Sequence, residues 1–412
     1  MHWGTLMLIE KVIQNMFNNY NWKLKEVDSF NPPYYDRKLA LYIHVPFCTS
    51  LCPFCIFHSI LYKPSLKKGY FDALKKELEK YISMGFNFST IYIGGGTPTL
   101  ATEEVCDLLD YIKEYNKIDD ISIEASPYDI NDEKVSELEK TGITRLSLGV
   151  ESFVPVIQRK IGRQQVNTEE LLEKIDIASK IPTLNVDILF NIPGQKKEDL
   201  VNEIDIVKKS KANQITFYPI MPSIRQAPKE FMYPDEKNEK MLYNVLTNQF
   251  SDSDYYQSTA WTFSKNQGSI VDEYIIDNDD FIGVGTGAMS HLSQYYYANS
   301  FSLEKYEKMI NNGKFSISLL RELNLKDQIY IYLIYRLYSL KINKKEFETK
   351  FNHDIYHYLR SEINLLSFLG IIKDDGNYFK VTNNGKYYSN LFMKYLYINI
   401  SNIRKYAIQN KI

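Results

Sequence analysis

At 412 residues, the chain is long for a single domain and suits one large domain with a smaller one. Its formal net charge of −2, with 24% charged residues, excludes a strong overall attraction to nucleic acid or to an anionic membrane. No segment reaches the roughly 18 consecutive apolar residues of a membrane-spanning helix, so we expect a cytoplasmic protein without a membrane span.

Residues 1–38 are predicted to form an N-terminal leader. A short apolar stretch there is interrupted by Glu10 and Lys11, and no small-residue cleavage site follows it. This pattern favours an amphipathic helix over a secretory signal.

From residue 39 onward, short apolar runs alternate with amphipathic helical patterns. The helix predicted over 67–84, for example, carries Tyr70, Leu74 and Leu78 on one face. Six apolar runs are predicted strands, at residues 40–45, 90–93, 121–124, 145–150, 184–190 and 214–218. This alternation is typical of an α/β fold with a parallel sheet, so we expect a partial (β/α)6 barrel over residues 39–315.

Beyond residue 315 the composition changes to Tyr, Leu, Ile and Lys with few glycines. Helices are predicted over 326–340, 344–351 and 355–369, and the pair Asp375-Gly376 reads as the turn of a β-hairpin. Residues 316–412 are therefore predicted to form a winged-helix-like α+β domain.

Three of the four cysteines, Cys48, Cys52 and Cys55, follow the first predicted strand with the spacing C-x₃-C-x₂-C. Three thiolates without a fourth describe an iron–sulfur cluster in which one iron stays open to another ligand. Zinc is the alternative, with His44 or His58 as fourth ligand, but the distant second ligand pair of a zinc ribbon is missing.

Disulfides are a poorer interpretation of the same cysteines, because three clustered thiols leave one unpaired. The fourth cysteine, Cys106, alternates with apolar residues at helical spacing and is predicted to lie in the core.

Unusual residues also follow the later strands, and in such barrels ligands collect at the carboxyl ends of the strands. The run Gly94-Gly95-Gly96 would let backbone approach a ligand closely, although a tight turn explains it equally well. Polar side chains stand near the other strand ends, where any one alone is more often a surface or ion-pair residue: Glu124, Glu151, Asp187 and Arg163.

Together these motifs resemble the radical S-adenosylmethionine (SAM) superfamily, and within it the oxygen-independent coproporphyrinogen III oxidase-like branch. The resemblance rests on residues 42–48 with the cysteine spacing, then 94–99, 145–153 and 186–195 in the same order, and it extends from about residue 41 to residue 292. It implies that the three cysteines hold a [4Fe–4S] cluster whose open iron binds the amino and carboxylate groups of SAM.

The resemblance also implies an enzyme, a radical SAM oxidoreductase. An electron from the reduced cluster would cleave SAM to a 5′-deoxyadenosyl radical, which abstracts hydrogen from the substrate. A low-potential electron donor such as flavodoxin or ferredoxin is implied as a partner.

By similarity, two sets of residues match positions around SAM. Those around a first molecule are Tyr42, Gly95, Glu124 and Pro219. Those around a second molecule, which the oxidase binds, are Phe54, Gly96, Thr97, Glu151, Arg163 and Asp187. One or two SAM molecules are therefore expected.

Two positions depart from the oxidase pattern. Phe57 stands where the oxidase has a further cysteine, as in related haem-chaperone and methyltransferase branches, and Glu151 stands where the oxidase has glutamine. The second change would replace an amide by a charge at one contact to the second SAM.

The glycine-rich stretch 281–292 resembles the segment by which this branch closes its active site. His291 within it is expected either to approach a porphyrin or haem iron, or to be a structural histidine. Three arginines could meet substrate propionates by bidentate contacts, namely Arg145, Arg163 and Arg225, although Arg145 could equally be structural inside the barrel.

We expect the C-terminal domain to be a lid over the barrel mouth rather than a DNA-binding module, because its predicted helix 355–369 offers only Arg360 as a fixed cation. The predicted activity is on a tetrapyrrole, first of all oxidative decarboxylation of propionates. The alternatives are methyl transfer with the second SAM as donor, a haem-binding chaperone without decarboxylase turnover, and, more distantly, a transcriptional regulator.

Overall fold

The computed structural model describes residues 24–222, 229–265 and 278–412. The helix predicted at the start of the leader and the candidate Arg225 lie outside these residues. Within residues 24–38, the described part of the leader contains a short strand, β1 (Lys25–Glu26), which pairs with β15 (Ile317–Glu322).

The centre of the molecule is a set of neighbouring parallel strands that confirms the predicted partial barrel. Each of the six predicted strands lies within an observed one, and the register joins them in chain order. The six are β2 (Lys38–Val45), β5 (Asn87–Gly95), β6 (Asp120–Ala125), β7 (Arg145–Glu151), β8 (Thr183–Phe190) and β9 (Gln214–Pro219). Because they run parallel, their carboxyl ends meet at one edge of the sheet.

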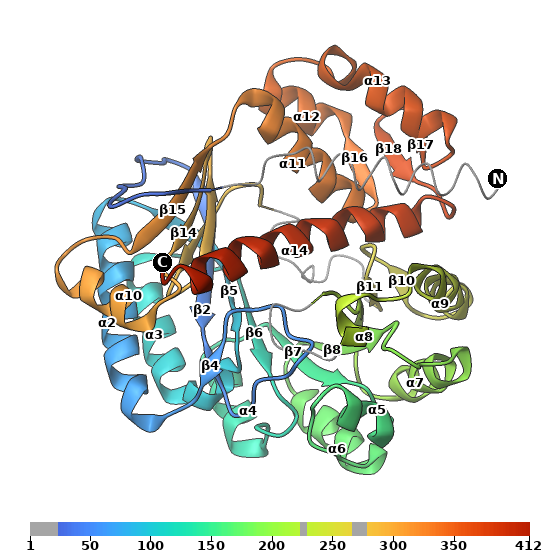
Figure 1. The fold of residues 1–412 in the computed structure, drawn as a ribbon, viewed down its shortest axis with the longest axis horizontal. Helices are drawn as coiled ribbons and strands as arrows, with labels where there is room; N and C mark the ends of the chain where they lie inside the picture. Colours follow the sequence, from blue (N-terminus) through green and yellow to red (C-terminus); the bar gives the residue numbers. More distant parts are fainter. Residues whose placement is uncertain (1–23, 223–228, 266–277) are drawn as a thin grey trace.

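Helices that connect these strands cover the outer side of the sheet (Figure 1). The first, α2 (Pro64–Ser83), begins three residues before the predicted start, because a proline suits the first turn of a helix. Its predicted apolar face is fully buried in the core. The others are α3 (Thr102–Tyr115), α4 (Asp132–Lys140), α5 (Pro155–Lys160), α6 (Thr168–Ala178) and α7 (Lys197–Lys209), with a 3₁₀ turn η1 (Pro98–Ala101) before α3. Two more helices, α8 (Lys229–Met232) and α9 (Glu236–Gln249), follow β9. Cys106 is buried on α3, as predicted.

The glycine-rich stretch adds a seventh parallel strand, β12 (Phe281–Val284), beside β2. An antiparallel extension follows, made of β13 (Met289–Leu292), β14 (Tyr295–Asn299) and β15, with α10 (Leu303–Asn311) between the last two. On the other edge, β11 (Thr262–Ser264) pairs antiparallel with β9, and β10 (Tyr256–Gln257) pairs with β11. The whole sheet therefore has 13 strands among the described residues.

The C-terminal region forms the expected winged-helix-like arrangement. Its helices are α11 (Leu325–Tyr338), α12 (Lys344–Phe351) and α13 (Ile355–Phe368), and its three-stranded sheet combines β16 (Lys341–Asn343), β17 (Ile372–Asp374) and β18 (Tyr378–Val381). Gly376 has φ +98° in the predicted hairpin turn. The domain limit at residue 315 stays a prediction, and β15, just beyond it, belongs to the large sheet.

The last helix, α14 (Lys386–Gln409), was not predicted. It crosses in front of the barrel strands and returns the chain toward α10 (Figure 1), where the backbone N–H of Phe301 donates to the Ile412 carbonyl at 2.9 Å. Its buried residues include Tyr387, Leu391 and Leu396. A helix that is buried on several sides carries no clear amphipathic stripe, which explains why its sequence gave no helical signal.

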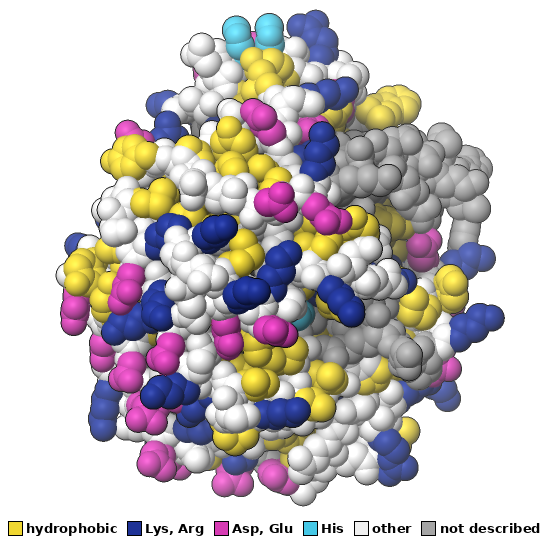
Figure 2. Space-filling model, turned by 60° about the vertical axis from the view of Figure 1, so that its left-hand side comes forward, with side chains coloured by type: hydrophobic (Ala, Val, Ile, Leu, Met, Phe, Trp, Pro, Cys, Tyr) yellow, Lys and Arg dark blue, Asp and Glu magenta, His cyan; other side chains and the backbone are white. Residues whose placement is uncertain are grey.

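Acidic and basic side chains are interspersed over the face shown in Figure 2, without a field of one sign. Of the helices in the described residues, none has the length and apolar character to cross a membrane.

Candidate active site

A cavity of about 260 Å³ lies at the carboxyl ends of the parallel strands. The residues expected to hold the cluster and SAM all line this cavity: Cys48, Cys52, Cys55, Tyr42, Phe54, Gly95, Gly96, Thr97, Glu124, Glu151, Arg163, Asp187 and Pro219. These residues come from strand ends and loops spread over about 180 positions of the chain. The parallel sheet brings them together because it gathers its carboxyl ends at one edge.

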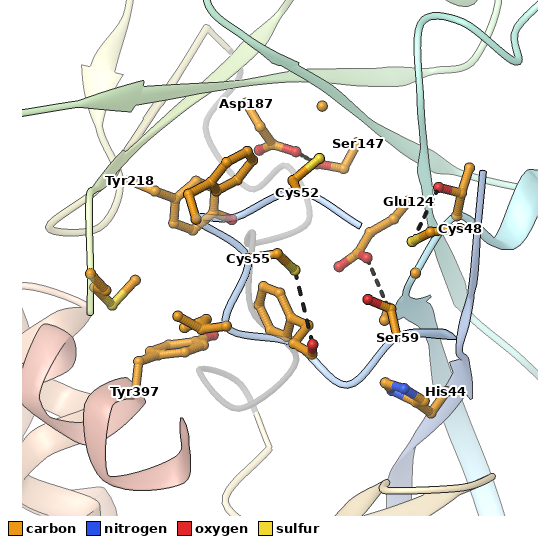
Figure 3. A pocket seen from close by; sticks show the side chains of 18 of the residues that line it. His44, Cys48, Cys52, Cys55, Ser59, Glu124, Ser147, Asp187, Tyr218 and Tyr397 are labelled. Carbon is orange, nitrogen blue, oxygen red and sulfur yellow. Dashed lines mark hydrogen bonds between the residues drawn. The ribbon is translucent and has the colours of Figure 1, made fainter. Parts of the chain in front are cut away.

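The three cysteines reach the cavity from one loop (Figure 3). The loop is closed at its base by a short parallel pair, β3 (Phe47–Cys48) with β4 (Ile60–Leu61), and the Cys55 backbone N–H donates to the Cys52 carbonyl at 3.2 Å. Burial raises the pKa of Cys48 to about 11 and also raises the pKa of Cys52. Iron binding must therefore displace protons from these thiols.

His44 is engaged in a way that removes it as a fourth zinc ligand. Its Nδ1 is 2.8 Å from the Tyr42 hydroxyl and its Nε2 is 2.9 Å from the His58 carbonyl, while the two histidine rings stack at 5.8 Å. Burial, followed by the Arg404 cation, lowers the pKa of His44 to about 3. In the described part of the chain, no three His, Cys, Asp or Glu side chains are grouped as a single metal ion would require.

The glycine run packs the end of β5 against the cysteine loop. Gly95 has φ +114°, and a Cβ there would lie 2.4 Å from the His44 ring. A Cβ on Gly96 would lie 2.5 Å from the Phe47 carbonyl oxygen, which accepts a hydrogen bond from the Thr97 backbone N–H at 2.7 Å. The glycine run therefore forms a turn and also brings its backbone close to the cysteine loop. Both structural features that the sequence suggested, the tight turn and the close backbone approach, are present.

Glu124 is oriented by two donors from β5. The Tyr92 hydroxyl donates to its Oε1 and the Gly95 backbone N–H donates to its Oε2, both at 2.9 Å. Gly94 makes room for this carboxylate, because a Cβ at that position would lie 2.7 Å from Oε1. The glycine run thus positions an acidic group as well as the cysteine loop.

Asp187, on β8, is held in a similar way on the next part of the wall. Its Oδ2 accepts a hydrogen bond from the Ser147 hydroxyl at 2.7 Å (Figure 3). Its Oδ1 accepts one from the Asn185 amide, also at 2.7 Å. Two carboxylates therefore face the same cavity with fixed orientations, which suits an ammonium group or ribose hydroxyls.

Glu151 and Arg163 form an ion pair with a 2.7 Å separation at the end of β7. Glu151 has φ +66°, which a non-glycine residue rarely adopts. The guanidinium of Arg163 also lies over the Phe54 ring, 5.7 Å from its centroid. A Cβ on Gly162 would lie 2.6 Å from Pro53, so the loop that carries Arg163 packs directly on the cysteine loop.

A buried polar network that the sequence did not predict supports this turn. The carboxyl group of Glu203, on α7, is fully buried and bonds to the Ser152 hydroxyl, and its other oxygen accepts from the Gln195 amide at 3.3 Å. Gln158 donates to the Ser152 carbonyl at 2.9 Å. Burial raises the pKa of Glu203 to about 8. The sequence signals for this network were that Ser152 lies within the motif at 145–153 and Gln195 within the motif at 186–195.

Other candidates lie away from the cavity. His291 is buried on β13 between the rings of Phe281 and Tyr296 and does not line the cavity, so the structural interpretation holds for it. Arg145 is fully buried, and its Nε donates to the Gln214 side chain at 2.7 Å, which makes it structural inside the barrel. Neither reaches a ligand in this cavity.

The sequence analysis named none of the residues on one side of the cavity as site candidates. Aromatic and apolar side chains from β9, the antiparallel extension, α11 and α14 line it, together with one arginine: Tyr218, Met221, Tyr296, Tyr335, Leu396, Tyr397, Ile400 and Arg404. These residues meet only through tertiary packing, so no local motif marks them.

A partial parallel barrel with a three-cysteine loop at the carboxyl ends of its strands defines the class of protein as a radical SAM barrel. Residues 42–207 match the model of the Radical SAM superfamily. The heme chaperone HemW of Bacillus subtilis (strain 168) is 25% identical over 372 residues, which are 85% of this chain and 97% of that protein. The oxygen-independent coproporphyrinogen III oxidase of Escherichia coli (strain K12) is 26% identical over 305 residues, which are 68% of this chain and 66% of that protein.

A solved structure of one of these relatives has the same fold as this chain. The structure of coproporphyrinogen III oxidase (HemN) from Escherichia coli superposes with a TM-score of 0.73 at 21% identity and covers 88% of this chain and 91% of that one. Residues 42–207 thus form a Radical SAM domain, and the similarity to HemW and HemN together with the shared fold supports the branch that contains those two proteins. A Radical SAM domain implies a [4Fe–4S] cluster and SAM, and the residues present fit both: three thiols on one loop, a close glycine backbone and two oriented carboxylates.

Proposed function

We propose that this protein reductively cleaves SAM at a [4Fe–4S] cluster held by Cys48, Cys52 and Cys55 and that it acts on a tetrapyrrole. The observation that carries the proposal is the composition of one cavity. Three thiols, oriented polar groups and an aromatic wall share it, so a cofactor and a flat substrate could meet there.

The cluster, when bound, supplies the electron that cleaves SAM. The chain's own residues orient the cofactor and exclude water. In our proposal, Tyr42, Gly95, Glu124 and Pro219 surround a first SAM. A second SAM would lie against a second group, which consists of Phe54, Gly96, Thr97, Glu151, Arg163 and Asp187.

The tetrapyrrole is supported by the aromatic and apolar side of the cavity. Rings of Tyr218, Tyr335 and Tyr397 offer flat faces or edges to a flat ligand. The first candidate reaction is oxidative decarboxylation of propionates, as in the coproporphyrinogen III oxidases that the chain resembles. A low-potential donor such as flavodoxin or ferredoxin would reduce the cluster.

Haem handling is the second candidate, and two observations favour it. The sequence match extends over 97% of the Bacillus subtilis HemW, whereas it covers 66% of the Escherichia coli oxidase and 83% of the Pseudomonas aeruginosa oxidase. In addition, Phe57 replaces the further cysteine of the oxidase pattern. A haem chaperone of this branch would bind haem stoichiometrically instead of turning over a porphyrinogen.

One experiment separates the two candidates. Protein reconstituted and reduced without oxygen is incubated with SAM, with and without coproporphyrinogen III, and 5′-deoxyadenosine and carbon dioxide are measured. Decarboxylase activity predicts that the porphyrinogen stimulates both products. Haem handling predicts a low, unstimulated level of 5′-deoxyadenosine together with one haem bound per chain. Absence of both SAM cleavage and tetrapyrrole binding would refute the proposal.

A further inference from the structure

The far end of α14 brings one cation to the aromatic side of the cavity. Tyr397, Ile400 and Arg404 are spaced by three and four residues, so they share one face of the helix, and all three line the cavity. Arg404 is only 5% exposed. His44 lines the same cavity, and after burial the charge of Arg404 is the next cause of the lowered pKa of His44.

Arg404 is linked to the cysteine loop through Phe57. Its guanidinium lies 5.7 Å from the centroid of the Phe57 ring, and Tyr397 packs edge-on against the same ring at 6.2 Å. Phe57 follows Cys55 by two residues, and its carbonyl oxygen lies 4.0 Å from the Cys55 sulfur (Figure 3). The aromatic that replaces the further cysteine thus joins an arginine of the lid to the loop of the cluster ligands.

The distribution of charge in the cavity gives this arginine a distinct position. Among the described lining residues, Arg163 and Arg404 are the two arginines, and Arg163 is paired with Glu151 at 2.7 Å. The carboxylates of Glu124 and Asp187 are held at the strand ends by donors of the barrel. Arg404 is the lining arginine that lies beside Phe57, next to the aromatic side.

We propose that Arg404, with the rings of Phe57 and Tyr397, forms a subsite that binds a carboxylate of a flat aromatic substrate. A guanidinium presents a planar pair of donors that matches a carboxylate, and the adjoining rings pack against the apolar part of the ligand. This inference rests on the proposed function, because a tetrapyrrole with propionate groups has both parts. It adds a residue from α14, for which the sequence motifs offered no candidate.

The test varies the ligand and the protein together. Holoprotein reconstituted without oxygen, in the presence of SAM, is titrated with metal-free coproporphyrin III and with its tetramethyl ester, and the porphyrin absorbance band is followed. The ester keeps the flat ring and lacks the carboxylates. The proposal predicts that the parent protein binds the acid tighter than the ester. Arg404→Gln is expected to weaken binding of the acid by about tenfold or more, because a hydrogen bond to a charged group is lost, and to leave binding of the ester unchanged.

Two further variants complete the design. Lys405→Gln removes a positive charge from the neighbouring exposed position and is expected to change neither affinity. Arg404→Lys keeps the charge without the planar fork and is expected to lie between the parent and Arg404→Gln.

Equal losses for acid and ester in Arg404→Gln, or equal affinities of the parent for both ligands, would overturn the subsite while leaving the tetrapyrrole proposal standing. A parent protein that binds neither porphyrin nor haem would overturn the proposed function and the subsite together.

Discussion

At the scale of single residues, Glu151 is the non-glycine residue of the described cavity wall with a left-handed backbone. Such a conformation costs roughly 1 kcal/mol or more, and it persists only where the surroundings hold it. The ion pair with Arg163 and the Ser152–Glu203 network provide that support. Strain of this kind clusters at functional sites, which agrees with the position of Glu151 in the cavity.

The role of the cysteine loop can be tested by Cys52→Ala. Loss of one of three thiolates should abolish SAM cleavage and lower the iron bound per chain, because a cluster needs all three ligands. Cys106→Ala is the matched control, since that buried cysteine belongs to α3 and lies outside the cavity. Iron content and 5′-deoxyadenosine are measured for both. Full cleavage by Cys52→Ala would rule out the cluster assignment.

Gly95 provides a second test at this scale. Gly95→Ala combines positive φ with a Cβ 2.4 Å from the His44 ring, whereas Gly313→Ala has positive φ (+73°) and open space around the new atom. We expect the first substitution to lower the free energy of unfolding by about 2 kcal/mol more than the second. Chemical denaturation measures both. Equal effects would show that the approach of the β5 backbone to His44 is not tight.

At the scale of elements, buried polar contacts hold α14 against the barrel. Lys394 and Glu239 form an ion pair at 2.5 Å with side chains 2% and 0% exposed. Asn390 donates to the same carboxylate at 3.1 Å and accepts from the Trp261 indole N–H at 2.7 Å. These contacts place the helix where Tyr397 and Arg404 reach the cavity.

Lys394→Met should therefore loosen α14. It leaves the Glu239 charge buried without its cation, which costs about 3–5 kcal/mol in comparable proteins. The double variant Lys394→Met/Glu239→Gln should recover a large part of that loss, because the uncompensated charge is gone. Unfolding free energy and proteolysis within α14 report the effect. A single variant as stable as the exposed-site control Lys405→Met would contradict this account.

At the scale of the whole molecule, buried carboxyl groups couple stability to pH. Burial raises the pKa of Glu203 to about 8 and that of Glu77 to about 7. Glu77 accepts hydrogen bonds from the Gly285 backbone and the Tyr306 hydroxyl, so it joins α2 to the glycine-rich segment and α10. Each folded carboxyl keeps its proton at pH values where the unfolded chain has lost it.

The sign of the effect follows from linkage. Between about pH 4.5 and 8 the folded state binds more protons at Glu203 than the unfolded state, so this group's contribution to stability falls as pH rises. The slope approaches about 1.4 kcal/mol for each pH unit. Glu203→Gln cannot titrate, so the stability of the variant relative to the parent should increase from pH 5 to pH 8 and then level off.

Denaturation at several pH values tests this prediction. Glu198→Gln, an exposed position on the same helix, serves as the control and should follow the parent at every pH. A constant difference between Glu203→Gln and the parent would mean that Glu203 titrates in its ordinary range.

The sequence by itself determined the parallel barrel, the cysteine loop and the residues at the strand ends. These features are local, because strand periodicity, cysteine spacing and glycine runs each depend on residues that are close together in the sequence. The winged-helix-like arrangement was also predictable, and the helix predicted over 344–351 coincides with α12.

Only the tertiary structure showed which residues form the aromatic side of the cavity and the buried network beside it. Glu203 and Arg404 are ordinary charged residues in sequence, and burial against distant elements gives each its role. The same holds for α14, whose apolar residues face several partners, and for His291, which packing keeps out of the cavity. Contacts between residues far apart in the chain follow from packing geometry, which no local pattern encodes.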